Sequence, residues 1–156
     1  MKFVHGKLFQ NISTKKVQSL RYNPSDNYYE LICKAKQLGL RQAIITSDIM
    51  LQISEKLLVR YDYKIVCISF MVDDSELQSE IDALLKAQEK SKIYWALLKQ
   101  RLQYFSENDS IDIKRIEFSS TDGLFSVQVN GIFSTPESLY DSFSEQLADI
   151  VEGCIQ

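Results

Sequence analysis

The run Ile65–Val72 constrains the fold of this chain most, because it is the longest apolar stretch in the sequence. Only Ser69 interrupts it, and its eight residues are far fewer than the ~20 that a membrane-spanning helix needs. Apolar side chains on both faces are typical of a strand that is covered on both sides, as in a parallel sheet. We therefore predict a buried strand from Lys64 to Val72 in a soluble α/β protein.

Segments with helical and strand-like patterns alternate before this run. Residues 23–38 carry apolar side chains at helical spacing, with a proline in the expected first turn, and Gly39 follows where a C-terminal cap belongs. Residues 42–46 form a short apolar run with β-branched members, and Ser47-Asp48 directly after it suit the N-cap of another helix. This order of helix, strand, helix and strand is typical of an α/β domain.

A long helical segment follows the apolar run, from Ser75 to Phe105. Its apolar stripe becomes polar between Gln88 and Lys92 and then resumes. An unbroken helix of this length would extend about 46 Å at 1.5 Å per residue, which exceeds what a sheet of this size needs for cover. We expect one end to project and pack on another chain, and the alternative is a bend near Ser91.

The C-terminal part of the sequence predicts an antiparallel hairpin and a final helix. Residues 111–120 and 124–133 are strand-like, and residues 121–123 between them, Thr-Asp-Gly, have the composition of a turn. Asn-Gly at 130–131 predicts either a second turn or a bulge. Thr-Pro-Glu at 135–137 is the expected start of the last helix, with threonine as its N-cap.

The length of 156 residues and the 45% hydrophobic content suffice for one domain that buries its own core. Residues 2–9 and 17–23 add two strand-like segments at the N-terminus. We therefore predict a single α/β domain over residues 1–156. Its sheet is expected to be mixed, with five or six strands, with helices on both faces and with a C-terminal β-hairpin followed by an acidic helix.

The cysteines indicate a reducing environment. Cys33, Cys67 and Cys154 are odd in number, far apart and embedded among apolar residues, which favours reduced thiols over a disulfide framework. Together with His5, the one histidine, they offer no ligand set for zinc. The N-terminus has no apolar segment typical of a signal peptide. We expect a cytoplasmic protein without a cofactor, a bound metal or a membrane partner.

Charge is distributed unevenly along the chain. The net charge is −3, but residues 1–72 hold eleven Lys/Arg against five Asp/Glu, and residues 73–156 hold seven against sixteen. The first part therefore sums to +6 and the second to −9. Such an asymmetry bears on partners and association and not on the fold.

The predicted last helix carries four acids at intervals of four residues. They are Glu137, Asp141, Glu145 and Asp149. Each like-charged pair at this spacing costs about 0.2–0.5 kcal/mol, so the three successive pairs cost on the order of 1 kcal/mol. One interpretation is that water and salt screen them. The sharper hypothesis is that they face cations of this chain or of a second subunit. The candidate cations are Lys2, Lys7, Lys15 and Lys16.

Aspartates at the ends of predicted strands support a catalytic alternative. Asp48 follows one strand, and Asp73 and Asp74 follow the next, so in a parallel sheet they would meet at one edge and hold Mg²⁺ for phosphodiester chemistry. The competing interpretation is that these residues only cap the helices that follow. Asp112 and Lys114 match half of a metal-dependent nuclease motif, but a match over three residues is expected often by chance.

No glycine-rich phosphate loop and no nucleophile-elbow motif occurs in the sequence. The basic residues 1–22 are compatible with nucleic acid, although the acidic pI of about 5.2 opposes it. We therefore expect a protein–protein interaction or assembly module that self-associates, most simply as a dimer, without a chemical step. A metal-dependent phosphodiesterase or nuclease is the first alternative, and a nucleic-acid-binding protein is the second.

Overall fold

The computed structural model describes residues 2–88, 93–109 and 111–155. The elements in chain order are β1 (Phe3–Asn11), β2 (Val17–Tyr22), α1 (Tyr28–Gln37), β3 (Leu40–Gln42), α2 (Ser47–Arg60), β4 (Lys64–Phe70), α3 (Ser75–Gln88), α4 (Ile93–Asn108), β5 (Ile113–Ser120), β6 (Gly123–Gln128), β7 (Ile132–Pro136), the 3₁₀ turn η1 (Glu137–Leu139) and α5 (Tyr140–Cys154). Helices and strands are thus combined in one chain, which confirms the predicted α/β class. No helix of the described residues has the length and apolar character required to cross a membrane.

The strands form one seven-stranded sheet in the order β2-β1-β7-β6-β5-β4, and β3 pairs with β1 beside this path. Every pairing among the described strands is antiparallel. The sheet of the described residues therefore has seven strands and antiparallel pairings, where five or six strands in a mixed sheet were expected. The prediction that Lys64–Val72 lies in a parallel arrangement, covered on both faces, is wrong. β4 pairs with β5 at the end of this order, its register shifts between Ile65 and Cys67, and Val66 is 49% exposed.

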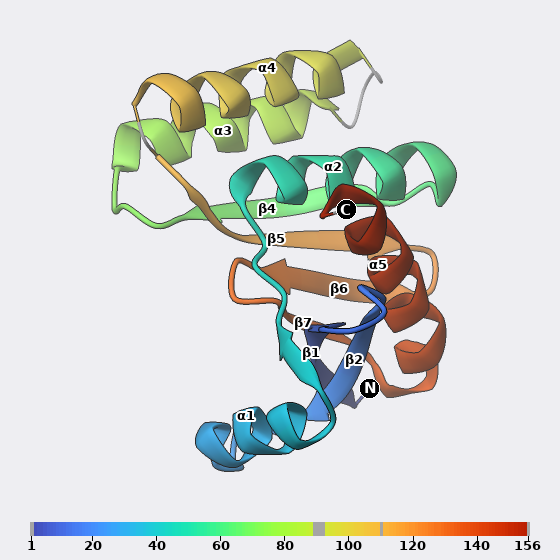
Figure 1. Cartoon of the computed structure of the whole chain (residues 1–156). Coiled ribbons are helices and arrows are strands. Elements are labelled where there is room, and N and C mark those ends of the chain that lie inside the picture. Colours follow the sequence, from blue (N-terminus) through green and yellow to red (C-terminus); the bar gives the residue numbers. More distant parts are fainter. Residues whose placement is uncertain (1, 89–92, 110, 156) are drawn as a thin grey trace.

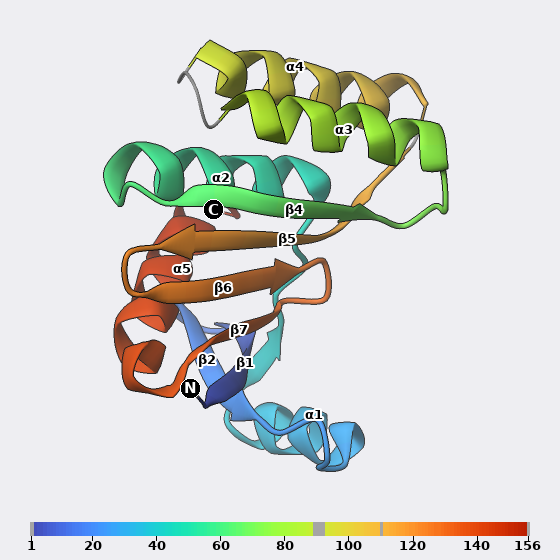
Figure 2. The same ribbon diagram turned by 180° about the vertical axis from the view of Figure 1, so that it is seen from behind.

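Helices lie on both faces of the sheet, but unequally. The main core joins α2 and α5 to one face, and Leu8 of β1 points into it. Phe9 points to the opposite face, where it packs with Ala35 of α1 and Leu40 of β3 in a smaller cluster. From behind, β5 and β6 lie in front of α5, and none of the drawn helices lies over them (Figure 2). One face is thus covered along the sheet and the other mainly at the β1 end.

The segment predicted as one long helix is two helices. α3 ends at Gln88 and α4 begins at Ile93, and the two lie side by side beyond β4 (Figure 1). The expected projecting helix is therefore wrong, because α4 folds back along α3 and buries its apolar residues, such as Leu98, in the main core. The bend expected near Ser91 falls on residues 89–92, outside the described residues. α3 also covers the edge of β4, since Gln78 Nε2 donates to Ile68 O at 2.9 Å.

The C-terminal strands and helix follow the prediction with one correction. β5 and β6 pair as the expected hairpin through residues 121–122, and the chain turns again at Gly131, whose φ is +81°, so that β7 pairs with β6. Thr135 does not cap the last helix, because Thr135 and Pro136 still belong to β7 and η1 separates them from α5. The side of α5 that includes Phe143 and Leu147 is buried.

Two caps differ by a residue or more from the prediction. Thr46 and not Ser47 caps α2, through Thr46 Oγ1, which accepts from Ile49 N at 3.3 Å. α1 starts at Tyr28 with Asn27 as its cap, so the proline at 24 precedes the helix instead of lying in its first turn. Gly39 follows the end of α1 with a φ of +73°, which confirms the C-terminal cap predicted at this glycine.

Candidate functional site

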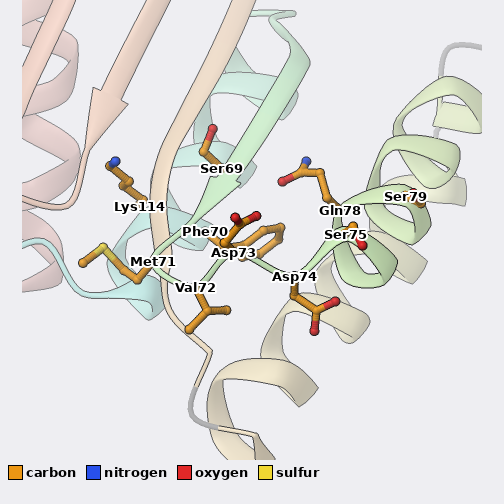
Figure 3. A pocket seen from close by; sticks show the side chains of 10 residues that line it. All are labelled: Ser69, Phe70, Met71, Val72, Asp73, Asp74, Ser75, Gln78, Ser79 and Lys114. Atoms are coloured by element: carbon orange, nitrogen blue, oxygen red, sulfur yellow. The ribbon is translucent and has the colours of Figure 1, made fainter.

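A cavity of about 580 Å³ lies where β4 leads into α3 (Figure 3). Its lining residues are Ser69, Phe70, Met71, Val72, Asp73, Asp74, Ser75, Gln78, Ser79 and Lys114. Met71 and Val72 are exposed although both are apolar. Two of the three aspartates of the catalytic alternative thus line a cavity, together with one lysine.

The geometry of these aspartates matches a helix cap more than a metal site. Asp74 Oδ1 accepts from Glu76 N at 3.1 Å and from Leu77 N at 3.0 Å, so its carboxylate is engaged in capping α3. The carboxylates of Asp73 and Asp74 point in different directions (Figure 3). Asp48 is not among the lining residues, and its carboxylate accepts from Gln52 Nε2 on α2. In the described ranges, no group of three or more His, Cys, Asp or Glu side chains is placed to hold a metal ion.

Asp112 and Lys114 also have separate roles. Asp112 Oδ1 accepts from Ser47 Oγ at 3.1 Å, and Ser47 Oγ in turn accepts from Ile113 N at 3.0 Å. These two bonds fix the start of α2 to the start of β5. Lys114 instead lines the cavity, so the two residues do not converge as they would in a nuclease site.

The acidic residues of the last helix form an exposed surface. We call Asp141, Glu145 and Asp149 the acidic α5 surface, because all three are exposed on the side of α5 away from its buried residues. None of the three makes a salt bridge with another described residue. Glu137 is separate from this surface, since it lies in η1, 3.8 Å from Lys2 Nζ, and both side chains are largely exposed. Such an ion pair contributes little to stability.

The basic N-terminal segment lies along the acidic helix. β2 packs beside α5, where Val17 N donates to Glu152 Oε1 at 2.9 Å and the Arg21 guanidinium lies 4.3 Å from the centre of the Tyr140 ring. Lys15 and Lys16 are exposed in the turn between β1 and β2. Lys15 and Lys16, which directly precede Val17, therefore lie near the C-terminal end of α5. Among the predicted cations, Lys2 alone forms a salt bridge within the described residues.

Lys7 is the exception among the predicted cations, because its side chain is fully buried. Lys7 Nζ donates to Asn130 O and lies 5.9 Å from the Phe9 ring centre and 5.7 Å from that of Tyr28. Burial lowers the pKa of Lys7 from its ordinary 10.5 to about 8, since the charged form loses its hydration. Lys7 thus belongs to the interior between α1 and the sheet and not to an exposed basic surface.

A second cavity, which the sequence reasoning did not identify, lies at the start of α5. We call it the tyrosine pocket; its volume is about 200 Å³. Its lining residues are Tyr61, Tyr63, Asp122, Phe125, Leu139, Ser142 and Gln146. Burial raises the pKa of Tyr63, and the charge of Asp122 raises it further. The Tyr-Asp-Tyr sequence at 61–63 is the one local signal that could have drawn attention to this site.

Comparisons of the chain with protein-family models, with curated proteins and with solved structures find no match.

Proposed function

We propose that the protein is an interaction module without a chemical step, and that its acidic α5 surface docks cationic groups of a protein partner. One observation carries the proposal. Asp141, Glu145 and Asp149 are displayed on a helix whose opposite side is buried, and they have no salt-bridge partner among the described residues. The proposed location is the cytoplasm, which is supported by the three free cysteines.

The energetics favour an external cation. Asp141 and Glu145, and Glu145 and Asp149, are like-charged pairs at i,i+4 spacing, so together they cost about 0.4–1 kcal/mol. A docked cation replaces this repulsion with attraction, and α5 is already ordered, which keeps the entropic cost of binding low. The C-terminal part of α5 is also tied to β2, because Val17 N donates to Glu152 Oε1 at 2.9 Å.

The proposed partners are a second copy of the chain and another protein with a basic segment. Each copy has both an acidic α5 surface and the exposed cations Lys15 and Lys16, and reciprocal contacts of this kind are typical of a two-fold dimer. The β1–β2 turn that carries them is well defined, because Asn11 Oδ1 accepts from Ser13 N and Thr14 N.

Sedimentation at two ionic strengths tests the proposal. We expect association of the full chain at about 50 mM salt and dissociation at about 500 mM, because screening shortens from ~14 Å to ~4 Å over this range. The triple variant Asp141→Asn, Glu145→Gln, Asp149→Asn should stay monomeric at both. A wild-type chain that is monomeric at both salts and binds no basic peptide would remove the support for this function.

The alternatives have less support in the geometry. A metal-dependent phosphodiesterase built on Asp48, Asp73 and Asp74 lacks Asp48 in the cavity, and Asp74 is engaged as a cap. Nucleic-acid binding by the N-terminal segment is weakened because Lys7 is buried and because the acids of α5 lie next to β2, where they repel phosphates.

A further inference from the structure

We propose that the tyrosine pocket receives an arginine side chain of a basic segment of another protein, which docks on the acidic α5 surface. This inference rests on the proposed function and specifies its anchor point. The pocket and the surface occupy neighbouring sides of α5, because Ser142 and Gln146, which line the pocket, follow Asp141 and Glu145 by one residue each, or about 100° around the helix.

The size of the pocket favours a single side chain over a metabolite. Sites for small molecules usually measure about 300–1,000 Å³, and this pocket measures about 200 Å³. Three separate segments enclose it, namely the connection from α2 to β4, the turn between β5 and β6, and the start of α5. A long side chain from a docked segment fits such a space.

The walls of the pocket are aromatic. The Tyr63 ring centre lies 5.0 Å from that of Phe125, which also lines the pocket. From the core, the Phe143 ring supports Tyr63 at 15° and 6.2 Å between centres. Tyr61 approaches the Tyr63 ring edge to face at 6.5 Å. A guanidinium group stacks on aromatic faces and is attracted by them, and it loses less hydration than an ammonium group does.

Three polar side chains at the pocket present acceptors for a guanidinium, beside the donors of the tyrosine hydroxyls and of the Gln146 amide nitrogen. Asp122 provides an exposed carboxylate, and Gln146 Oε1 holds only a long 3.5 Å contact from Tyr63 Oη. The Ser142 hydroxyl donates to Leu139 O, so its oxygen is left to accept. Arginine offers five N–H donors in a planar fork, which suits acceptors spread over several segments better than lysine does.

The backbone holds the two tyrosines in place before binding. Asp62, between them, has a φ of +58°, a conformation that costs a non-glycine residue on the order of 1 kcal/mol. Leu57 O accepts from both Tyr61 N at 3.2 Å and Tyr63 N at 3.1 Å, which maintains this tight turn. A preorganised pocket of this kind loses little entropy when it is filled.

Two peptides of equal length and charge test the inference, one with arginine and one with lysine among glycine and serine residues. We would measure fluorescence anisotropy with the full chain at low salt. The arginine peptide should bind about two- to fivefold more tightly, by the magnitude of an exposed cation–π contact. Tyr61→Ala, at an exposed position, should abolish this preference and leave the lysine peptide unaffected, whereas Asp122→Asn, also exposed, should weaken both peptides and the arginine peptide more. Tyr29→Ala, an exposed tyrosine on α1, is the matched control.

The outcomes separate this inference from the proposed function. Equal affinity for both peptides overturns the pocket assignment while the acidic surface keeps its role. In another outcome, Tyr61→Ala removes the arginine preference, but neutralising the acidic α5 surface does not change peptide binding. This result supports the pocket and overturns the proposed function. Self-association that Tyr61→Ala abolishes would assign the pocket to a second copy and overturn the choice of another protein. Binding of neither peptide overturns both.

Discussion

Lys7 and the acidic α5 surface carry charge in opposite environments. Lys7 is fully buried between aromatic rings, with a carbonyl as its hydrogen-bond acceptor. Asp141, Glu145 and Asp149 are exposed to solvent and lie next to each other on one helix. Burial penalises the charge of Lys7 through lost hydration, whereas the acids interact mainly with each other and with salt. The comparison teaches that a buried charge bears directly on the stability of the fold, whereas an exposed cluster leaves its charges open to solvent, salt and any proposed partner.

The largest effect is expected from truncation of Lys7. Lys7→Ala removes a long buried side chain, so the free energy of unfolding should fall by about 2–4 kcal/mol, as for other large side chains in a core. Lys7→Met keeps most of the volume and should change it by less than about 1.5 kcal/mol. Urea denaturation measures both.

The exposed Lys16 provides the control, since Lys16→Ala should change stability by less than about 0.5 kcal/mol. Equal small effects at positions 7 and 16 would show that the two lysines share one environment, and the comparison would then fail.

The pH dependence of stability gives the next largest effect. The folded pKa of Lys7 is about 8 and its ordinary value is 10.5, so between these values the unfolded chain binds more protons than the folded chain. Stability should therefore rise with pH in this window, by up to about 1.4 kcal/mol per unit. Tyr28, Tyr63 and Tyr140 have raised pKa values and reverse the trend above pH 10.

The measurement is a urea titration at several values between pH 8 and 9, below the tyrosine range. Burial also raises the pKa of the Cys67 and Cys154 thiols from 9.0, so these groups oppose the trend above about pH 9. Lys7→Met should flatten the profile. A wild-type profile that is already flat would mean that the folded and unfolded chains bind the Lys7 proton equally.

Much of the fold could be predicted from local patterns. The cap at Gly39, the hairpin around residues 121–123 and the buried side of α5 follow from turn chemistry and helical spacing, which act within a few residues. The antiparallel sheet could not, because the apolar run at β4 looks the same whether the strand is central or at an edge. Its true position depends on β5, more than 40 residues later in the sequence.

The candidate sites divide in the same way. Exposure of the acidic α5 surface follows from the helical period, since Phe143 and Leu147 occupy the opposite side. Burial of Lys7 could not be predicted, because it requires α1 to cover that end of β1. The tyrosine pocket was missed because Tyr61, Asp122 and Gln146 meet only in the tertiary structure.

A smaller effect is expected from neutralising the acidic α5 surface. The variant Asp141→Asn, Glu145→Gln, Asp149→Asn relieves two like-charged pairs, so the monomer should gain about 0.4–1 kcal/mol at low salt. High salt should remove the gain, because screening already relieves the repulsion in the wild type. Thermal melting at both salts measures this difference.

The control is Glu107→Gln, an exposed acid on α4 outside this surface, which should leave stability unchanged at either salt. A loss of stability in the triple variant would indicate that the acids are already compensated within the chain.

The smallest effect on stability is expected from a divalent metal ion. It tests a third set of charges, whose environment lies between that of the buried Lys7 and that of the exposed acidic α5 surface. Asp73 and Asp74 are exposed but line a cavity with Lys114, whose positive charge disfavours a cation there. Because Asp74 also caps α3, it gives up two backbone hydrogen bonds if it binds a metal. A ligand stabilises the fold only as far as its concentration exceeds its Kd, so about 5 mM Mg²⁺ should shift the Tm by less than about 1 °C. A rise of several degrees that Asp73→Asn abolishes would instead assign the cavity to metal chemistry, and the interaction proposal would lose its advantage over the enzymatic one.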